Sequence, residues 1–147
     1  MFEELQALTA PEPKRRDVAA AVLGDLLRNA ALDVSSTRLI VGRLVSLAVD
    51  DPVSMVRESA LNSSSEALDH HRLPLDIVRP LAAAMPTMER ELLAHALYIS
   101  GATHDPRARP LIEPFLVHPD ADVREEAERA AAEIIAARDR RTGQAGQ

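Results

Sequence analysis

Histidines and carboxylates are the side chains through which this chain could bind a metal ion or transfer a proton. His70 and His71 are adjacent, and neighbouring residues of a helix point about 100° apart, so their rings cannot easily share one ion. Glu91 and His95 lie four residues apart on one helical face, but no third ligand accompanies them. The chain has no cysteine and no nucleophile, phosphate-loop or zinc-protease motif. The sequence therefore predicts no catalytic residue, no metal site and no cofactor.

Arginine followed directly by an acid is the clearest polar pattern, and it occurs four times. The pairs are Arg16 with Asp17, Arg57 with Glu58, Arg90 with Glu91, and Arg124 with Glu125. Each arginine could bond an acid or a carbonyl of the next copy and fix how the copies stack, and an exposed pair of this kind contributes about 0.2–1 kcal/mol. Alternatively, Glu58, Glu91 and Glu125 form an acidic stripe for a basic partner. The sequence leaves both explanations open.

Helices are the elements that must position these side chains. Hydrophobic residues make up 46% of the chain and aromatic residues only 2%, so the core has to consist of Ala, Leu, Val and Ile, which suits close helix–helix packing. No long run alternates with period two. The hydrophobic spacing predicts helices over residues 2–8, 13–30, 37–49, 53–69, 74–85, 88–100, 106–117 and 121–140. We expect a single domain over residues 1–140 and a disordered polar tail over residues 141–147.

Residues 51–61 recur in altered form as residues 119–127. In both copies Val-Arg-Glu begins four residues after a proline, and an alanine lies three residues after the arginine. The turn prolines Pro52, Pro86 and Pro119 are separated by 34 and 33 residues. Repetition at this period is typical of a helical solenoid, in which stacked helix pairs bury faces that one pair cannot bury alone.

The pattern Asp-Pro-x-x-x-Val-Arg-x-x-Ala at residues 51–60 resembles the HEAT repeat of the armadillo-type helical-repeat family, particularly the bacterial form in phycobilisome-lyase-like proteins. The match is good at residues 51–61 and 119–127 and weaker at residues 86–97 and 16–27. The resemblance implies an all-α fold, a right-handed α-solenoid of about four HEAT-like helix pairs. It also implies that the second helix of each pair lines the concave face. Lysine occurs only once beside many arginines, which is compatible with a high-GC bacterial source.

The same resemblance implies a non-catalytic protein-binding module or scaffold that uses the concave face. The contact residues predicted there are Glu58, Asn62, Glu91, His95, Tyr98 and Glu125. Further polar residues outside the core stripe are Ser65, Glu66, Asp69, Arg129 and Glu133. Tyr98 is the only tyrosine, and tyrosine is enriched at interface hot spots. A net charge of −6 favours a basic protein as partner, and an inhibitor or immunity-type protein is one form that such a module can take.

Two other classes of function stay open. HEAT-like folds include DNA glycosylases and tetrapyrrole lyases, but recognising bases relies on stacking aromatics and cationic surfaces. A chain without tryptophan and with a net charge of −6 does not favour these, so no nucleic-acid partner is expected. The other class is a structural homo-oligomer, such as a homodimer, that associates through the alanine-rich segment Ala130–Ala137 at the end of the solenoid.

Three features predict a cytoplasmic protein without a membrane partner. Cysteine is absent, the N-terminus is acidic where a signal peptide is basic, and no segment approaches 18 consecutive apolar residues.

Small residues inside the predicted helices indicate close packing. Gly24 and Gly42 each cost about 1 kcal/mol relative to alanine, which predicts a close helix crossing in the first half of the chain. Gly101 is predicted to end a helix. The run Asn62–Ser65 at a helix centre predicts hydroxyls that bond to carbonyls four residues earlier, or else a polar pocket on the inner face.

Overall fold

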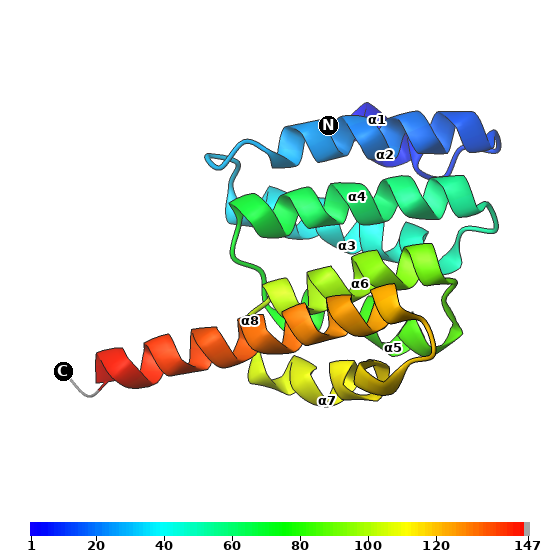
Figure 1. Ribbon diagram of the computed structural model, residues 1–147. Coiled ribbons are helices and arrows are strands. Elements are labelled where there is room, and N and C mark those ends of the chain that lie inside the picture. Colours follow the sequence, from blue (N-terminus) through cyan, green and yellow to red (C-terminus); the bar gives the residue numbers. More distant parts are fainter. Residues whose placement is uncertain (146–147) are drawn as a thin grey trace.

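The computed structural model describes residues 1–145, and this part of the chain is helical with short turns and no strand (Figure 1). The all-α prediction is therefore confirmed. The α-helices are α1 (Phe2–Ala7), α2 (Pro13–Leu27), α3 (Val34–Asp50), α4 (Ser54–His70), α5 (Leu75–Ala84), α6 (Arg90–Ala102), α7 (Arg109–Ile112) and α8 (Ala121–Ala145). Three short 3₁₀ helices accompany them: η1 (Met85–Thr87), η2 (Pro106–Ala108) and η3 (Glu113–Val117).

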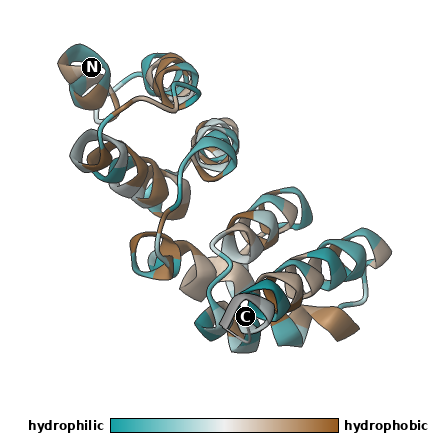
Figure 2. Cartoon of the chain, turned by 90° about the vertical axis from the view of Figure 1, so that its left-hand side faces the viewer, coloured by the Kyte–Doolittle hydropathy of each residue, from teal (hydrophilic) through white to brown (hydrophobic). Residues whose placement is uncertain are grey.

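Helices consecutive in the chain pack in pairs, and the pairs pack on one another. Helix α2 contacts α4, α4 contacts α6 and α6 contacts α8, so these four form one layer. Helices α3 and α5 contact each other, and each packs on its following helix in the first layer. Figure 2 shows the helices nearly end-on, with the two rows descending side by side from the N-terminal to the C-terminal end.

The core lies between these two rows and is aliphatic, as the composition predicts. Its largest fully buried side chains are Leu23, Leu27, Ile40, Leu44, Leu61, Leu75, Leu81, Met85, Leu93, Leu97, Ile99 and Ile112. Phe115 is the one buried aromatic side chain in the described residues. Full burial of a Leu or Ile side chain stabilises the fold by about 1.5–3 kcal/mol, so this continuous aliphatic seam holds the pairs together.

Two glycines let neighbouring helices of the first layer approach closely. A Cβ atom added to Gly24 would lie 2.9 Å from the Cβ of Ser63, and one added to Gly101 would lie 2.7 Å from the Cα of Ala130. Gly24 therefore confirms the predicted close crossing, here between α2 and α4. The prediction for Gly42 is wrong, because nothing lies near the place of its missing side chain. Gly101 does not end a helix but lies inside α6, where it makes room for α8.

Local chemistry explains where the helix ends differ from the predictions. Helix α3 begins at Val34, earlier than predicted, because the carboxylate of Asp33 accepts the N–H of Ser36 at 2.9 Å and caps the helix. The predicted helix over 106–117 is broken into η2, α7 and η3. Pro110 and Pro114 each lack an N–H donor and crowd the preceding turn, which disfavours a continuous α-helix.

The C-terminal helix is longer than predicted. Helix α8 continues as far as Ala145, so the predicted helix end at residue 140 is wrong and the helix enters the segment predicted as a polar tail. No proline follows Arg140, and Gly143 lies inside the helix rather than ending it. The remaining part of the predicted tail, residues 146–147, lies outside the described residues.

Across the part of the chain that the structure describes, none of the helices combines the length and the apolar character that crossing a membrane would require.

Candidate functional site

The repeated arginines connect neighbouring helix pairs at two places. The Nε and Nη2 atoms of Arg16 donate to the two carboxylate oxygens of Asp51 at 2.7 and 3.2 Å. Arg90 Nη1 donates to a carboxylate oxygen of Asp120 at 3.1 Å. Each aspartate lies in the turn before a helix of the following pair, so the arginine reaches the next copy of the repeat. The acid that it reaches is the turn aspartate and not the acid next to an arginine.

The other two arginines bond within their own pair. Arg57 Nε donates to the carbonyl of Ala48 at 2.7 Å, and Arg124 Nη1 donates to the carbonyl of His118, also at 2.7 Å. The turn that precedes α6 contains Met85–Met88 and no aspartate, so Arg57 has no counterpart of Asp51 in the following pair. These contacts support the stacking role of the arginines.

The turn aspartates have two roles at once. Asp51 also accepts the N–H of Val53 at 2.9 Å, and Asp120 accepts the N–H of Asp122 at 2.9 Å, so both close the turn before their helix. Burial alone would raise the pKa of Asp51, but the bonds from Arg16 and Val53 outweigh it and hold the pKa below its usual range. The bond from Arg90 is the main cause that lowers the pKa of Asp120.

The acids that follow the arginines lie on the surface. Glu58, Glu91 and Glu125 are all exposed. Glu91 lies 3.5 Å from Arg90, and Glu125 lies 2.6 Å from Arg129, so an arginine already balances two of the three charges. The predicted acidic stripe is therefore partly neutralised within the chain.

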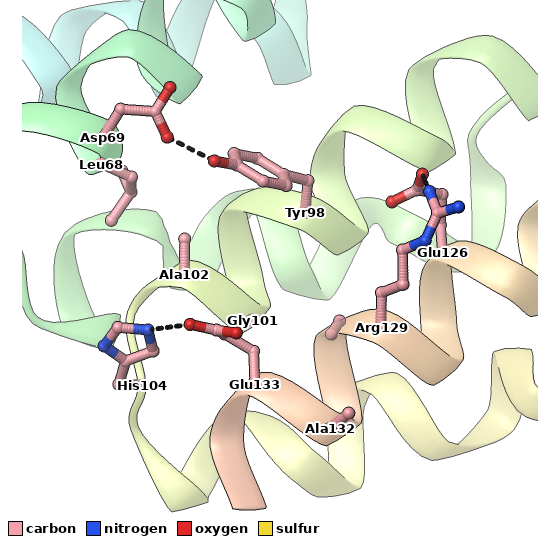
Figure 3. A pocket seen from close by; sticks show the side chains of 11 residues that line it. Leu68, Asp69, Tyr98, Gly101, Ala102, His104, Glu126, Arg129, Ala132 and Glu133 are labelled. Carbon is pink, nitrogen blue, oxygen red and sulfur yellow. Dashed lines mark hydrogen bonds and ion pairs between the residues drawn. The ribbon is translucent and has the colours of Figure 1, made fainter. Parts of the chain in front are cut away.

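A groove lies where the end of α4 meets α6 and α8, and we call it the α4–α6–α8 groove (Figure 3). It is an open depression of about 820 Å³. Small residues also line it, among them the buried Gly101 and Ala130 and the more exposed Ala102 and Ala132. Its polar lining residues are Asp69, Tyr98, His104, Glu126, Arg129 and Glu133. Gly101 lets α6 and α8 approach closely beneath the groove. Above this contact, larger polar side chains line a space that stays open to solvent.

Tyr98 stands on the α6 side of the groove and reaches back to α4. Its side chain is 43% exposed, and its hydroxyl donates to a carboxylate oxygen of Asp69 (Figure 3). This hydrogen bond to a carboxylate is the main cause that raises the pKa of Tyr98 to about 12. At neutral pH the hydroxyl is therefore a fixed donor, and the ring presents an apolar face with a polar tip.

His104 and Glu133 join α6 to α8 at the far end of the groove. His104 Nε2 lies 2.9 Å from a carboxylate oxygen of Glu133 (Figure 3). His104 has a φ of 58°, the left-handed conformation that ends many helices and that usually belongs to glycine. This conformation after the last turn of α6 directs the ring toward α8.

Arg129 and its acidic neighbours lie on the α8 side. Arg129 donates to Glu125 at 2.6 Å and to Glu126 at 2.9 Å. The groove is lined by three carboxylates, Asp69, Glu126 and Glu133, against one guanidinium and one imidazole. Three carboxylates outnumber the basic side chains of the lining, so the groove favours a cationic ligand.

The residues predicted for partner binding are not gathered in one place. Tyr98 lines the α4–α6–α8 groove, and Glu125 holds Arg129 at its edge. Asn62 lines a smaller groove of about 200 Å³ between α2 and α4. Glu58, Glu91 and His95 line neither of these two grooves.

Two of the polar groove residues, His104 and Glu126, were not predicted. The spacing of Glu126 and Arg129, three residues apart on one helical face, is a signal that could have indicated Glu126. His104 gives no such signal, because its place depends on the left-handed conformation at the end of α6.

The serine run of α4 is structural. Ser64 donates to the carbonyl of Ala60 at 2.8 Å and Ser65 donates to that of Leu61 at 3.1 Å, which confirms the predicted bonds to carbonyls four residues earlier. Ser63 instead donates across the crossing to the carbonyl of α2 at Ala20, at 2.7 Å.

Within the described residues no group of three or more His, Cys, Asp or Glu side chains is arranged to hold a metal ion. No family model and no curated protein matches the chain. Among solved structures, the crystal structure of an engineered protein matches with a TM-score of 0.65 and 18% sequence identity. The match covers 90% of this chain and 61% of the engineered protein, so the chain spans about three fifths of its length. This likeness shows a shared helical fold and nothing about activity.

Proposed function

We propose that this protein is a non-catalytic binding module, a HEAT-like α-solenoid that takes a basic segment of a partner protein into the α4–α6–α8 groove. The successive packing of α2, α4, α6 and α8 supports the solenoid architecture. Two arginine contacts add to this support: Arg16 with Asp51, and Arg90 with Asp120. In both, an arginine and a turn aspartate connect neighbouring helix pairs.

The observation that carries the proposal is the combination of charge and shape in the groove. Three carboxylates line it, and each has one hydrogen-bond partner among the described residues, which leaves acceptor sites for an incoming cation. The alanines that line the groove suit the aliphatic stem of a lysine or arginine, and the face of the Tyr98 ring suits its charged end.

An inhibitor or immunity-type protein is a form of this function that the charge favours. An acidic module attracts a basic partner from a distance and thereby speeds their association. The groove is formed by helices that pack on one another, so the partner would meet a surface that is already formed.

Selection of peptides tests this proposal. Random peptides displayed on phage are selected against the immobilised wild type, and the enriched peptides are titrated by fluorescence polarisation. We expect arginine- or lysine-containing peptides whose binding weakens with salt. Tyr98→Ala should weaken binding by about tenfold or more, as loss of an interface anchor does.

The matched control is Leu39→Ala, which removes a similarly exposed side chain, at 44%, from α3 in the other helix row. This variant should bind like the wild type. Failure to enrich any basic peptide, or equal weakening by both substitutions, would reject the groove as the binding site. Circular dichroism of each variant checks that the helices remain.

A further inference from the structure

The two ends of the helix layer each expose one half of a contact that the interior of the layer completes. Arg16 shows the complete form. Its Nη1 atom donates to the carbonyls of Ala10 and Pro11 at 2.9 and 3.0 Å, and its Nε and Nη2 atoms bond Asp51 of the next pair. One arginine thus holds its own turn and also the turn that follows in the stack.

Arg124 repeats the first half of this arrangement at the C-terminal end. Its Nη1 atom donates to the carbonyls of His118 and Pro119 at 2.7 and 3.0 Å, which lie six and five residues earlier, as Ala10 and Pro11 do for Arg16. Among the described residues no helix pair packs beyond α8, and no carboxylate lies within ion-pair distance of Arg124. The edge of Arg124 that corresponds to the Asp51-binding edge of Arg16 is thus open.

The face of α8 around Arg124 is open as well. Counted from the repeated arginine, Ala132 and Ile135 occupy the positions of Gly24 and Leu27 in α2. Gly24 and Leu27 are buried under α4, whereas Ala132 is exposed and Ile135 is 39% exposed. Figure 1 shows no helix beyond α7 and α8 at this end of the stack.

The N-terminal end exposes the complementary half. Val18 and Val22 of α2 occupy the positions at which Ser59 and Ser63 of α4 contact the preceding helix. They are 49% and 43% exposed because none of the described helices packs on this side of α2. Both ends therefore present apolar side chains where the interior of the layer buries helix against helix.

Glu12 is the acidic residue at the N-terminal end that is available to an arginine of another molecule. It lies four residues before Arg16, as Asp120 lies four residues before Arg124, and it forms the N-cap of α2. Its side chain is exposed and makes no capping bond, and no cation in the described residues lies within ion-pair distance. An acid in the place of a turn aspartate is thus available to an arginine from outside the chain.

We propose that a second copy of this chain docks head-to-tail, with the α2 end of one copy on the α8 end of the other. Glu12 then pairs with Arg124 as Asp120 pairs with Arg90. Val18 and Val22 pack against Ala132 and Ile135, and the helix layer continues from copy to copy. The two surfaces are different, so the association is heterologous and adds further copies unless the rotation closes a ring.

Sedimentation velocity tests the association, with charge reversals that identify the ends. The wild type should show a weight-average mass above the 16.0 kDa of one chain, rising with concentration. Arg124→Glu and Glu12→Arg should each lower the association constant by about fivefold or more, because each places like charges opposite one another. An equimolar mixture of the two variants should restore the association, since every contact in the mixed assembly then joins an acid to an arginine.

Val22→Glu guards against a loss of folding in Arg124→Glu, which also removes bonds to two carbonyls. Residue 22 is already exposed, so the variant should stay helical and sediment as a single chain. Met55→Glu, at a 50% exposed position of α4 away from both ends, should associate like the wild type. A mass of 16.0 kDa at all concentrations, or failure of the mixture to associate while both variants are helical, would overturn the proposal.

Discussion

The crossing of α2 with α4 and the crossing of α6 with α8 use the same kinds of contact. The ion pair is buried at the first crossing and exposed at the second. At each, an arginine reaches a turn aspartate and a glycine lies against the facing helix. The side chains of Arg16 and Asp51 are 12% and 3% exposed, whereas those of Arg90 and Asp120 are 56% and 25% exposed. The adjoining grooves differ likewise, at about 200 Å³ and about 820 Å³.

This difference teaches that one repeated motif can serve stability at one place and leave a surface free at another. Removing one partner of a buried ion pair leaves a charge that water cannot solvate, whereas an exposed pair exchanges easily with water. The N-terminal crossing is therefore expected to hold the fold, and the C-terminal crossing to leave room for a ligand.

Loss of the buried pair should have the largest effect. Asp51→Ala leaves the buried guanidinium of Arg16 without its carboxylate and should lower the free energy of unfolding by about 3 kcal/mol. Asp120→Ala removes an exposed pair and a turn bond and should cost about 1 kcal/mol. Urea unfolding followed by circular dichroism measures both. Equal costs for the two substitutions would contradict the contrast in burial.

Glycine substitutions compare the closeness of the two crossings. Gly101→Ala should cost about 2–3 kcal/mol, because the new methyl group meets the backbone of Ala130, which cannot rotate away. Gly24→Ala should cost about 1–2 kcal/mol, since the Ser63 side chain can adjust in part. Gly42→Ala, with nothing nearby, should instead stabilise by up to about 1 kcal/mol. Thermal and urea unfolding give the order, and destabilisation by Gly42→Ala would be inconsistent with its open surroundings.

The smallest expected effect concerns the only tyrosine. Because the pKa of Tyr98 is raised to about 12 from 10.0, the folded state retains the phenol proton longer than the unfolded state. The contribution of this proton to stability is fully present below pH 10.0 and is lost as the pH rises toward 12. Ultraviolet absorbance of the phenolate should show Asp69→Asn titrating at lower pH than the wild type. Coincident titration curves would mean that the Asp69 contact is absent in solution.

The helices and the aliphatic core could be predicted because each hydrophobic position repeats with the helical period. The ends of helices were harder, since they depend on single contacts such as the bond from Ser36 to Asp33. The broken segment 106–117 was predicted as one helix although its prolines were visible. Hydrophobic spacing carries no information about the backbone N–H donors that proline lacks.

The candidate site could be predicted only in part. Tyr98, Asp69, Arg129 and Glu133 were recognisable as polar residues outside the core stripe. The groove that unites them depends on how far α6 and α8 separate at the surface, which follows from three-dimensional packing at Gly101. The turn aspartates were also missed as partners of the arginines, since the contact joins residues 35 and 30 positions apart.

The prolines of the segment 106–117 have a consequence for motion. Pro106, Pro110 and Pro114 remove three amide protons from one short stretch, and α7 spans only four residues. A segment with few internal hydrogen bonds opens at low energetic cost, so we expect α8, which packs on it, to exchange its amide hydrogens with solvent sooner than α2 or α4. Binding of a ligand to the groove should therefore slow amide hydrogen exchange more in α8 than in α2 or α4.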